Sequence, residues 1–221
     1  MMKLPKIFRK KTLNDAVEYL DKGKVNKALK VLNANLHDKN ACAMLAHMYE
    51  HGSGVPKNIK KALQMYIRAA KLGSAEAKYL LGTFFSSGTY IERSTEKAFI
   101  FYKEAADGGM PEAQYKTGLF YLFGYLGNKD LDMAFRYFEM GAKQGHAKSQ
   151  NRLGLLYAGG RGTLKSDEDA VYWYRKAAEQ GHGEAMYNLG CMLTGGRGGK
   201  RDNKEALKWF NMAAKVYNAM P

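Results

Sequence analysis

Apolar residues follow a helix-spaced pattern that repeats every 36 residues along this chain. In the second unit, Ala77, Leu81 and Phe85 stand four positions apart and so share one face of a predicted helix. A second helical stretch carries the aromatic pair Phe101 and Tyr102. The pattern recurs without insertion, which predicts five tandem helix-turn-helix units: 38–73, 74–109, 110–145, 146–181 and 182–217.

Glycines and capping residues mark the ends of the predicted helices. Each first helix is expected to end at a glycine that accepts a left-handed backbone, at Gly52, Gly88, Gly124, Gly160 and Gly196. Residues able to cap the second helix follow, at Asn58, Ser94, Asp130, Ser166 and Asp202. Further glycines inside the first helix, such as Gly154, let the neighbouring helix come close. In the second helix small residues alternate with aromatics, so we expect large side chains of one unit to fill the space left by small ones of the next.

This periodicity predicts an all-α protein, a right-handed α-solenoid whose units stack to cover their apolar faces. Residues 12–37 contain two short helical patterns without the glycine signature, and we expect this pair to cap the N-terminal end. Residues 1–11 are rich in Lys and Arg and are expected to form a flexible basic tail. The five units, 38–217, are expected to form one continuous domain.

The recurring pattern resembles the Sel1-like repeat family, a relative of the tetratricopeptide repeats. In the fifth unit the matching residues are Ala185, Leu189-Gly190, Gly196, Ala206, Trp209-Phe210 and Ala213-Ala214. Ala46, Leu193 and Tyr217 depart from the pattern. The resemblance implies a scaffold whose inner face, built mainly from first helices, binds other proteins. The disulfides and enzymatic activities of the family's cysteine-rich branch are not implied, because its cysteines are missing here.

Composition and charge narrow the class of protein. The net charge of +14 is concentrated at the ends, with +6 in residues 1–37 and 0 in residues 110–145. Basic ends favour an acidic partner, a nucleic acid or an anionic membrane surface, although solubility explains such an excess equally well. No apolar run reaches the roughly 20 residues that span a bilayer, and the N-terminus lacks the apolar region of a secretory signal. Cys42 and Cys191 stand in different units, which predicts reduced thiols and a cytoplasmic location.

One string of residues matches a catalytic motif. His47, Glu50 and His51 form H-x-x-E-H, the pattern of inverted zinc peptidases. The intervening Tyr49 and the following Gly52 hold scaffold positions, and no third acidic ligand follows, so ordinary surface polar residues are favoured. His146 and His182 are interpreted as turn residues, and the glycine-rich loops do not match a phosphate-binding loop. We therefore predict no enzymatic activity, no metal and no cofactor.

The inner face of the third unit is unusually apolar. Tyr115, Leu119, Leu122 and Phe123 occupy non-scaffold positions there, beside Leu155 of the fourth unit. Exposed apolar clusters mark partner sites, although Leu122 and Phe123 could instead pack under the following loop. The complete predicted partner-binding set is Tyr79, Tyr115, Leu119, Leu122, Phe123, Asn151, Leu155, Tyr187, His47, Glu50 and His51.

The leading functional hypothesis is a non-enzymatic adaptor that holds a peptide or a partner protein on the concave face of the solenoid. The apolar middle would supply affinity and the basic ends would attract an acidic partner. Two alternatives remain. A nucleic-acid-binding repeat protein would use the basic ends, but its neutral middle units disfavour it. A toxin-neutralising, immunity-type binding protein is consistent with the family resemblance. The oligomeric state is left open.

Overall fold

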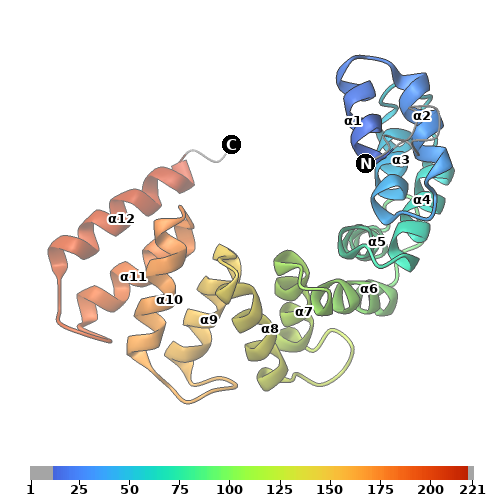
Figure 1. Ribbon diagram of the computed structural model, residues 1–221. Coiled ribbons are helices and arrows are strands. Elements are labelled where there is room, and N and C mark those ends of the chain that lie inside the picture. Colours follow the sequence, from blue (N-terminus) through green and yellow to red (C-terminus); the bar gives the residue numbers. More distant parts are fainter. Residues whose placement is uncertain (1–11, 219–221) are drawn as a thin grey trace, which may run out of the picture. The chain divides into compact units, whose positions relative to one another are not determined.

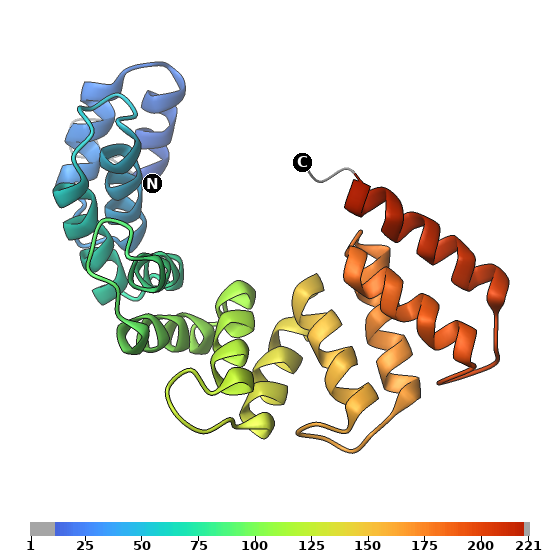
Figure 2. The same ribbon diagram turned by 180° about the vertical axis from the view of Figure 1, so that it is seen from behind.

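The computed structural model describes residues 12–218, and the predicted basic tail lies outside this range. The described residues form twelve α-helices and no strand (Figures 1 and 2). The helices are α1 Leu13–Asp21, α2 Val25–Ala34, α3 Lys39–His51, α4 Ile59–Lys71, α5 Ala75–Ser87, α6 Thr95–Asp107, α7 Pro111–Phe123, α8 Leu131–Lys143, α9 Ala147–Gly159, α10 Asp167–Glu179, α11 Gly183–Gly195 and α12 Asn203–Asn218. The all-α repeat architecture is therefore confirmed, with α1 and α2 preceding five helix pairs.

The chain divides into two compact units, with the boundary between Ser94 and Thr95. Unit 1 contains α1 to α5, and unit 2 contains α6 to α12. The boundary falls between the two helices of the second predicted repeat. That residues 38–217 form one continuous domain stays a prediction.

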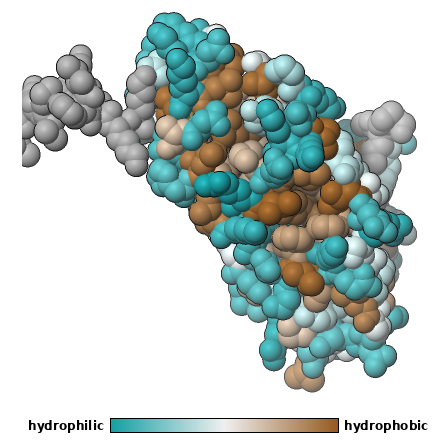
Figure 3. All heavy atoms as spheres, turned by 90° about the vertical axis from the view of Figure 1, so that its right-hand side faces the viewer, coloured by the Kyte–Doolittle hydropathy of each residue, from teal (hydrophilic) through white to brown (hydrophobic). Residues whose placement is uncertain are grey.

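Unit 1 is built on a core shared by its first helices. Ala16, Leu32, Leu45 and Ala41 are fully buried in this core, which joins α1, α2 and α3. The helix pair α3 and α4 is tied back to the segment before it, because Arg68 Nε donates to the carbonyl oxygen of Leu36 at 2.6 Å. On the face seen in Figure 3, hydrophobic residues are exposed among hydrophilic ones.

In unit 2 the first and second helices of the repeats form two layers. Arg175 of α10 pairs with Glu205 of α12, and the Tyr137 hydroxyl of α8 donates to Asp107 of α6 at 3.0 Å. Burial and this hydrogen bond raise the pKa of Tyr137 to about 12. In the other layer, Asn188 of α11 donates to an amide oxygen of α9 at 3.1 Å. Every consecutive pair of helices in unit 2 also packs together.

Close contact between a glycine and an aromatic ring sets the spacing inside each repeat of unit 2. A Cβ atom on Gly154 would lie 2.7 Å from the Tyr174 ring, and one on Gly190 would lie 2.6 Å from the Phe210 ring. A Cβ atom on Gly118 would likewise lie 2.7 Å from the Phe138 ring. The close approach predicted from the glycines is confirmed, and the ring comes from the second helix of the same repeat.

The predicted helix ends are present in the structure. The glycines that end the five first helices have left-handed backbones, with φ between 60° and 78°. Predicted caps Asn58, Asp130, Ser166 and Asp202 each accept a backbone N–H from three residues further on, at 2.8 to 3.1 Å. The loops between helices are therefore held at both ends by local backbone chemistry.

Glutamine side chains connect successive repeats of unit 2. Gln114 donates to the Ala106 carbonyl and accepts from Gln144. Thirty-six residues later, Gln150 donates to the Ala142 carbonyl and accepts from Gln180 at 2.7 Å. Gln114 and Gln150 are buried. These amides satisfy each other and so offset the cost of burying polar groups at the repeat boundary.

Thr117 breaks this rule of satisfied polar groups. Its side chain is fully buried, and its hydroxyl has no hydrogen-bond partner among the described residues. The corresponding positions in neighbouring repeats hold buried Leu81, Leu153 and Leu189. The hydroxyl therefore costs stability without a compensating bond.

A Gly190→Ala substitution tests the spacing constraint. The added methyl group would collide with the Phe210 ring, so we expect a loss of about 1–3 kcal/mol in the free energy of unfolding. Gly195→Ala in the same helix is the matched control, since its Cβ would meet Arg197 at an ordinary 3.5 Å. Urea unfolding measures both variants. Equal stability of the two would contradict the constraint.

Thr117→Val should stabilise the protein by about 1 kcal/mol, because it removes an unsatisfied hydroxyl and keeps the shape of the side chain. Thr194→Val is the control, because the Thr194 hydroxyl donates to the Gly190 carbonyl at 2.7 Å and this bond would be lost. Thermal melts followed by circular dichroism compare them. A lower melting temperature for Thr117→Val would show that the hydroxyl is satisfied in solution.

Candidate functional site

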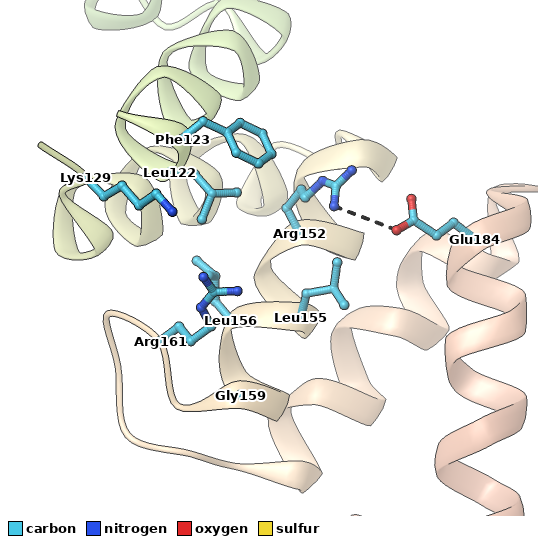
Figure 4. Close-up of a pocket in the computed structure, with 9 residues that line it drawn as sticks. All are labelled: Leu122, Phe123, Lys129, Arg152, Leu155, Leu156, Gly159, Arg161 and Glu184. Carbon is cyan, nitrogen blue, oxygen red and sulfur yellow. Dashed lines mark ion pairs between the residues drawn. The ribbon is translucent and has the colours of Figure 1, made fainter. Parts of the chain in front are cut away.

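A cavity of about 460 Å³ opens between the C-terminal ends of α7 and α9 in unit 2 (Figure 4). Its volume is in the range of pockets that hold small ligands and side chains. The residues that line it come from the third, fourth and fifth repeats: Leu122, Phe123, Lys129, Arg152, Leu155, Leu156, Gly159, Arg161 and Glu184. Because α9 supplies four of these nine residues, more than any other element, this helix forms the main wall.

The apolar wall of the cavity combines buried and exposed side chains. Leu122 and Leu156 are buried and belong to one core cluster, while Leu155 is half-buried. Phe123, the last residue of α7, keeps 47% of its surface exposed. Its ring lies 5.5 Å from the ring of Tyr125, which is also exposed. The buried leucines thus fix the wall, and the exposed aromatic pair extends it at the edge.

The rest of the lining is mainly basic. Arg152 and Glu184 form a loose ion pair across the α9 and α11 helices, with 3.7 Å between Nη1 and Oε1. Lys129 and Arg161 come from the two loops that follow α7 and α9, and neither forms an ion pair within residues 12–218. In Figure 4 both side chains extend toward the cavity. Two cations are therefore available to an incoming group.

The structure brings three predicted partner-binding residues together at this cavity: Leu122, Phe123 and Leu155. Of the pair whose exposure the sequence left open, Leu122 is buried and Phe123 is exposed. The cations Lys129, Arg152 and Arg161 are not among the residues predicted from the sequence. Two of them stand in loops rather than on the inner face of the first helices.

The remaining predicted residues of unit 2 lie outside the cavity lining. Tyr115 is half-buried between the rings of Phe138 and His146, at 5.9 and 5.4 Å, and Leu119 packs against the same core. Asn151 is 1% exposed and accepts the hydrogen bond from α11 described above. Tyr187 is well exposed and has one ring neighbour in α12. Their role in partner binding stays a prediction.

In unit 1 the H-x-x-E-H residues have local partners. His47 and His51 are exposed, and their rings stack with 4.2 Å between centroids. Glu50 accepts a hydrogen bond from the Tyr66 hydroxyl at 2.7 Å, which together with burial raises the pKa of Tyr66. Tyr79 is half-buried in α5. Within residues 12–218, no cluster of three or more His, Cys, Asp or Glu side chains is arranged to hold a metal.

His146 and His182 act as helix caps, a more specific role than the turn residues predicted. The Nδ1 atoms accept backbone N–H groups, from Ser149 at 3.3 Å and from Ala185 at 3.2 Å. The same repeat position holds the cap Ser74 in α5. Burial lowers the pKa of both imidazoles, and nearby cations add to this, whereas Glu112 or Glu184 opposes it. The neutral imidazole is therefore the form that caps.

Two further findings bear on location and chemistry. Cys42 is buried, which raises the pKa of its thiol, and Cys191 is exposed; neither is in a disulfide. No helix in the described part of the chain combines the length and the apolar character that crossing a bilayer requires.

Helix pairs that recur every 36 residues define an α-helical repeat protein of the tetratricopeptide-like class. A family model for the Sel1 repeat matches residues 39–74, 75–110, 111–146, 147–182 and 183–216. The chain therefore belongs to the Sel1 repeat family. Proteins of this family are generally scaffolds for protein–protein interaction and generally not catalysts.

Solved structures show the same fold. A Sel1 repeat protein from Oxalobacter formigenes is 29% identical, with a TM-score of 0.81 over 93% of this chain and 83% of that one. A protective antigen of uropathogenic Escherichia coli, with an SLR fold, is 24% identical, with a TM-score of 0.78 over 93% and 49%. An immunity protein from Pseudomonas aeruginosa is 17% identical, with a TM-score of 0.54 over 97% and 89%. A search of curated proteins finds no match.

The histidine caps predict a pH-dependent stability. Because the folded pKa is lowered, the unfolded chain binds protons more readily, so stability is complete above the ordinary pKa of about 6.5 and falls as the pH drops below it. Replacing both caps, as His146→Asn and His182→Asn, keeps an acceptor that does not titrate. We expect a smaller loss of melting temperature between neutral and mildly acidic pH, because about 1 kcal/mol of capping per site is retained.

The control is His37→Asn, an exposed histidine that caps no helix. It should keep the pH profile of the unchanged protein. If the double variant and this control have the same profile, the histidines are not the titrating caps.

Proposed function

We propose that this protein is an interaction scaffold that docks a segment of a partner protein in the cavity between α7 and α9. The observation that carries the proposal is an exposed aromatic side chain, Phe123, at the edge of a wall of buried leucines. Aromatic residues in such positions are enriched in binding hot spots, because they bury a large area with little loss of side-chain freedom.

The way the wall is built supports a docking role. Leu122 and Leu156 pack in the core of unit 2, so a partner meets a preformed apolar surface. A preformed surface loses less conformational entropy on binding than a flexible loop does. Leu155, which stands beside them on α9, presents the remaining apolar area.

The same observations favour a protein partner over a nucleic acid. A nucleic-acid-binding repeat array needs stacking and phosphate contacts in repeat after repeat. Here apolar and basic residues converge on one cavity, and its leucine wall suits amino-acid side chains. Toxin neutralisation remains one form of this docking function, and the immunity protein described above shares only the fold. The free thiols support a cytoplasmic location.

Site-specific photo-crosslinking in the native cell tests the proposal. A benzophenone amino acid placed at position 123, in place of Phe123, should crosslink to a defined partner protein, identified by mass spectrometry. The matched control carries the same group in place of Leu207, a residue on α12 that is more exposed than Phe123. The expected result is a crosslinked protein specific to position 123.

A second substitution tests whether the crosslink depends on the apolar wall. Adding the substitution Leu155→Asp to the position-123 protein should abolish the crosslink, because a charge on the wall opposes apolar docking. Circular dichroism confirms that the helices are intact. Identical crosslinks from positions 123 and 207, or none from position 123, would contradict the docking role.

A further inference from the structure

One basic residue of the cavity, Arg161, forms no ion pair within the described residues, whereas the equivalent arginine of the next repeat does. Arg197, 36 residues after Arg161, holds Asp167 in a bidentate ion pair, with Nη2 to Oδ1 at 2.6 Å and Nε to Oδ2 at 3.1 Å. The pair lowers the pKa of the Asp167 carboxyl. Asp167 lies 30 residues before Arg197. The residue 30 positions before Arg161 is Leu131, which has no carboxylate.

The two arginine loops sit in the same place on the helix before them. A Cβ on Gly198 would lie 2.3 Å from the carbonyl oxygen of Asp167, and one on Gly162 would lie 2.2 Å from that of Leu131. Both loops therefore press on the first residue of the preceding second helix, α10 or α8. The Arg161 loop therefore packs as the Arg197 loop does, but the residue in the place of Asp167 is Leu131.

A second cation lines the same cavity. Lys129 precedes Asp130, the cap of α8, but the Asp130 carboxylate accepts the backbone N–H of Met133 at 2.9 Å and forms no ion pair with Lys129. Glu184, the only acid of the lining, lies nearest to Arg152. The cavity thus has an excess of positive charge beside an apolar wall.

Building on the proposed docking function, we infer that the segment bound in this cavity is acidic and apolar. Its aliphatic or aromatic side chain packs on Leu122, Leu155 and Phe123, and an Asp, Glu or terminal carboxylate next to it pairs with Arg161 and Lys129. Charge-assisted bonds between a guanidinium and a carboxylate are strong and directional, so they select the register of the segment. The carboxylate takes the place that Asp167 holds for Arg197.

Charge complementarity also excludes one occupant from this chain. Residues 1–11 contain Lys3, Lys6, Arg9, Lys10 and Lys11 and no acid. That segment would bring like charge to Arg161 and Lys129, which opposes binding. The basic N-terminal segment is therefore not the occupant that this cavity selects.

Selection of random short peptides displayed on phage, with the full chain as bait, tests the inference. We expect the enriched peptides to place Asp or Glu beside a large apolar residue. The double variant Lys129→Glu, Arg161→Glu, selected in parallel, should lose these peptides and enrich peptides with Lys or Arg instead. Lys204→Glu, Lys215→Glu is the matched control, since it makes the same charge change at exposed positions of α12 and should select as the unchanged protein does.

A second variant keeps both cations. Leu131→Asp supplies Arg161 with an internal carboxylate at the position that Asp167 has relative to Arg197. It should weaken the binding of an enriched acidic peptide by roughly tenfold, measured by fluorescence anisotropy, because the guanidinium is already occupied. Circular dichroism melts verify the fold of each variant.

The outcomes separate this inference from the function on which it rests. Enriched peptides without acidic residues that still require Leu155 would overturn the inference and leave the docking function standing. Single-stranded RNA or DNA that displaces an acidic peptide at equal concentration would overturn it in favour of a phosphate ligand. The absence of any enriched peptide would also overturn it, and the crosslinking experiment then decides the docking function independently.

Discussion

The architecture of this protein depends on the contact between a glycine in the first helix of a repeat and an aromatic ring in the second helix. In unit 2, Gly154 and Tyr174, and likewise Gly190 and Phe210, leave no room for even one more carbon atom. This contact fixes how closely the two helices of a repeat approach. The spacing in turn determines where the helix ends and loops lie, and the cavity is lined from those ends and loops. The binding surface is thus a consequence of a steric limit in the core.

Most of the fold could be predicted because the signals that begin and end each helix are local in the sequence. Left-handed glycines such as Gly160 and side-chain caps such as Ser166 act through neighbouring backbone groups, and their effects are readable from a few adjacent residues. The source of each aromatic ring could not be read, since periodicity does not state which helix faces a glycine. The burial of the Thr117 hydroxyl was equally unreadable, because a single polar residue at a leucine position leaves the helical pattern intact.

The candidate site was only half predictable for a related physical reason. Phe123 and Leu155 break the repeat pattern on a helix face, so they stand out in the sequence. Arg161 and Arg197 look equivalent there, in similar glycine-rich loops. The two arginines differ in the residue that faces them, which stands 30 positions earlier in the sequence. Which residue faces the arginine follows from how the repeats stack, so it cannot be read from the sequence alone.

The pairs that connect one repeat to the next also give the repeats an order. Arg175 pairs with Glu205 and Arg197 pairs with Asp167 through a guanidinium and a carboxylate, and Tyr137 pairs with Asp107 through a phenol and a carboxylate. In each pair the two residues are 30 positions apart. If the fourth and fifth repeats exchanged places, Arg197 would face Leu131. Such an array would still satisfy the glycine and alanine pattern, but it would lose the two ion pairs between its last repeats. The repeats therefore share one sequence pattern but are not interchangeable, because each forms its polar pairs with one particular neighbour.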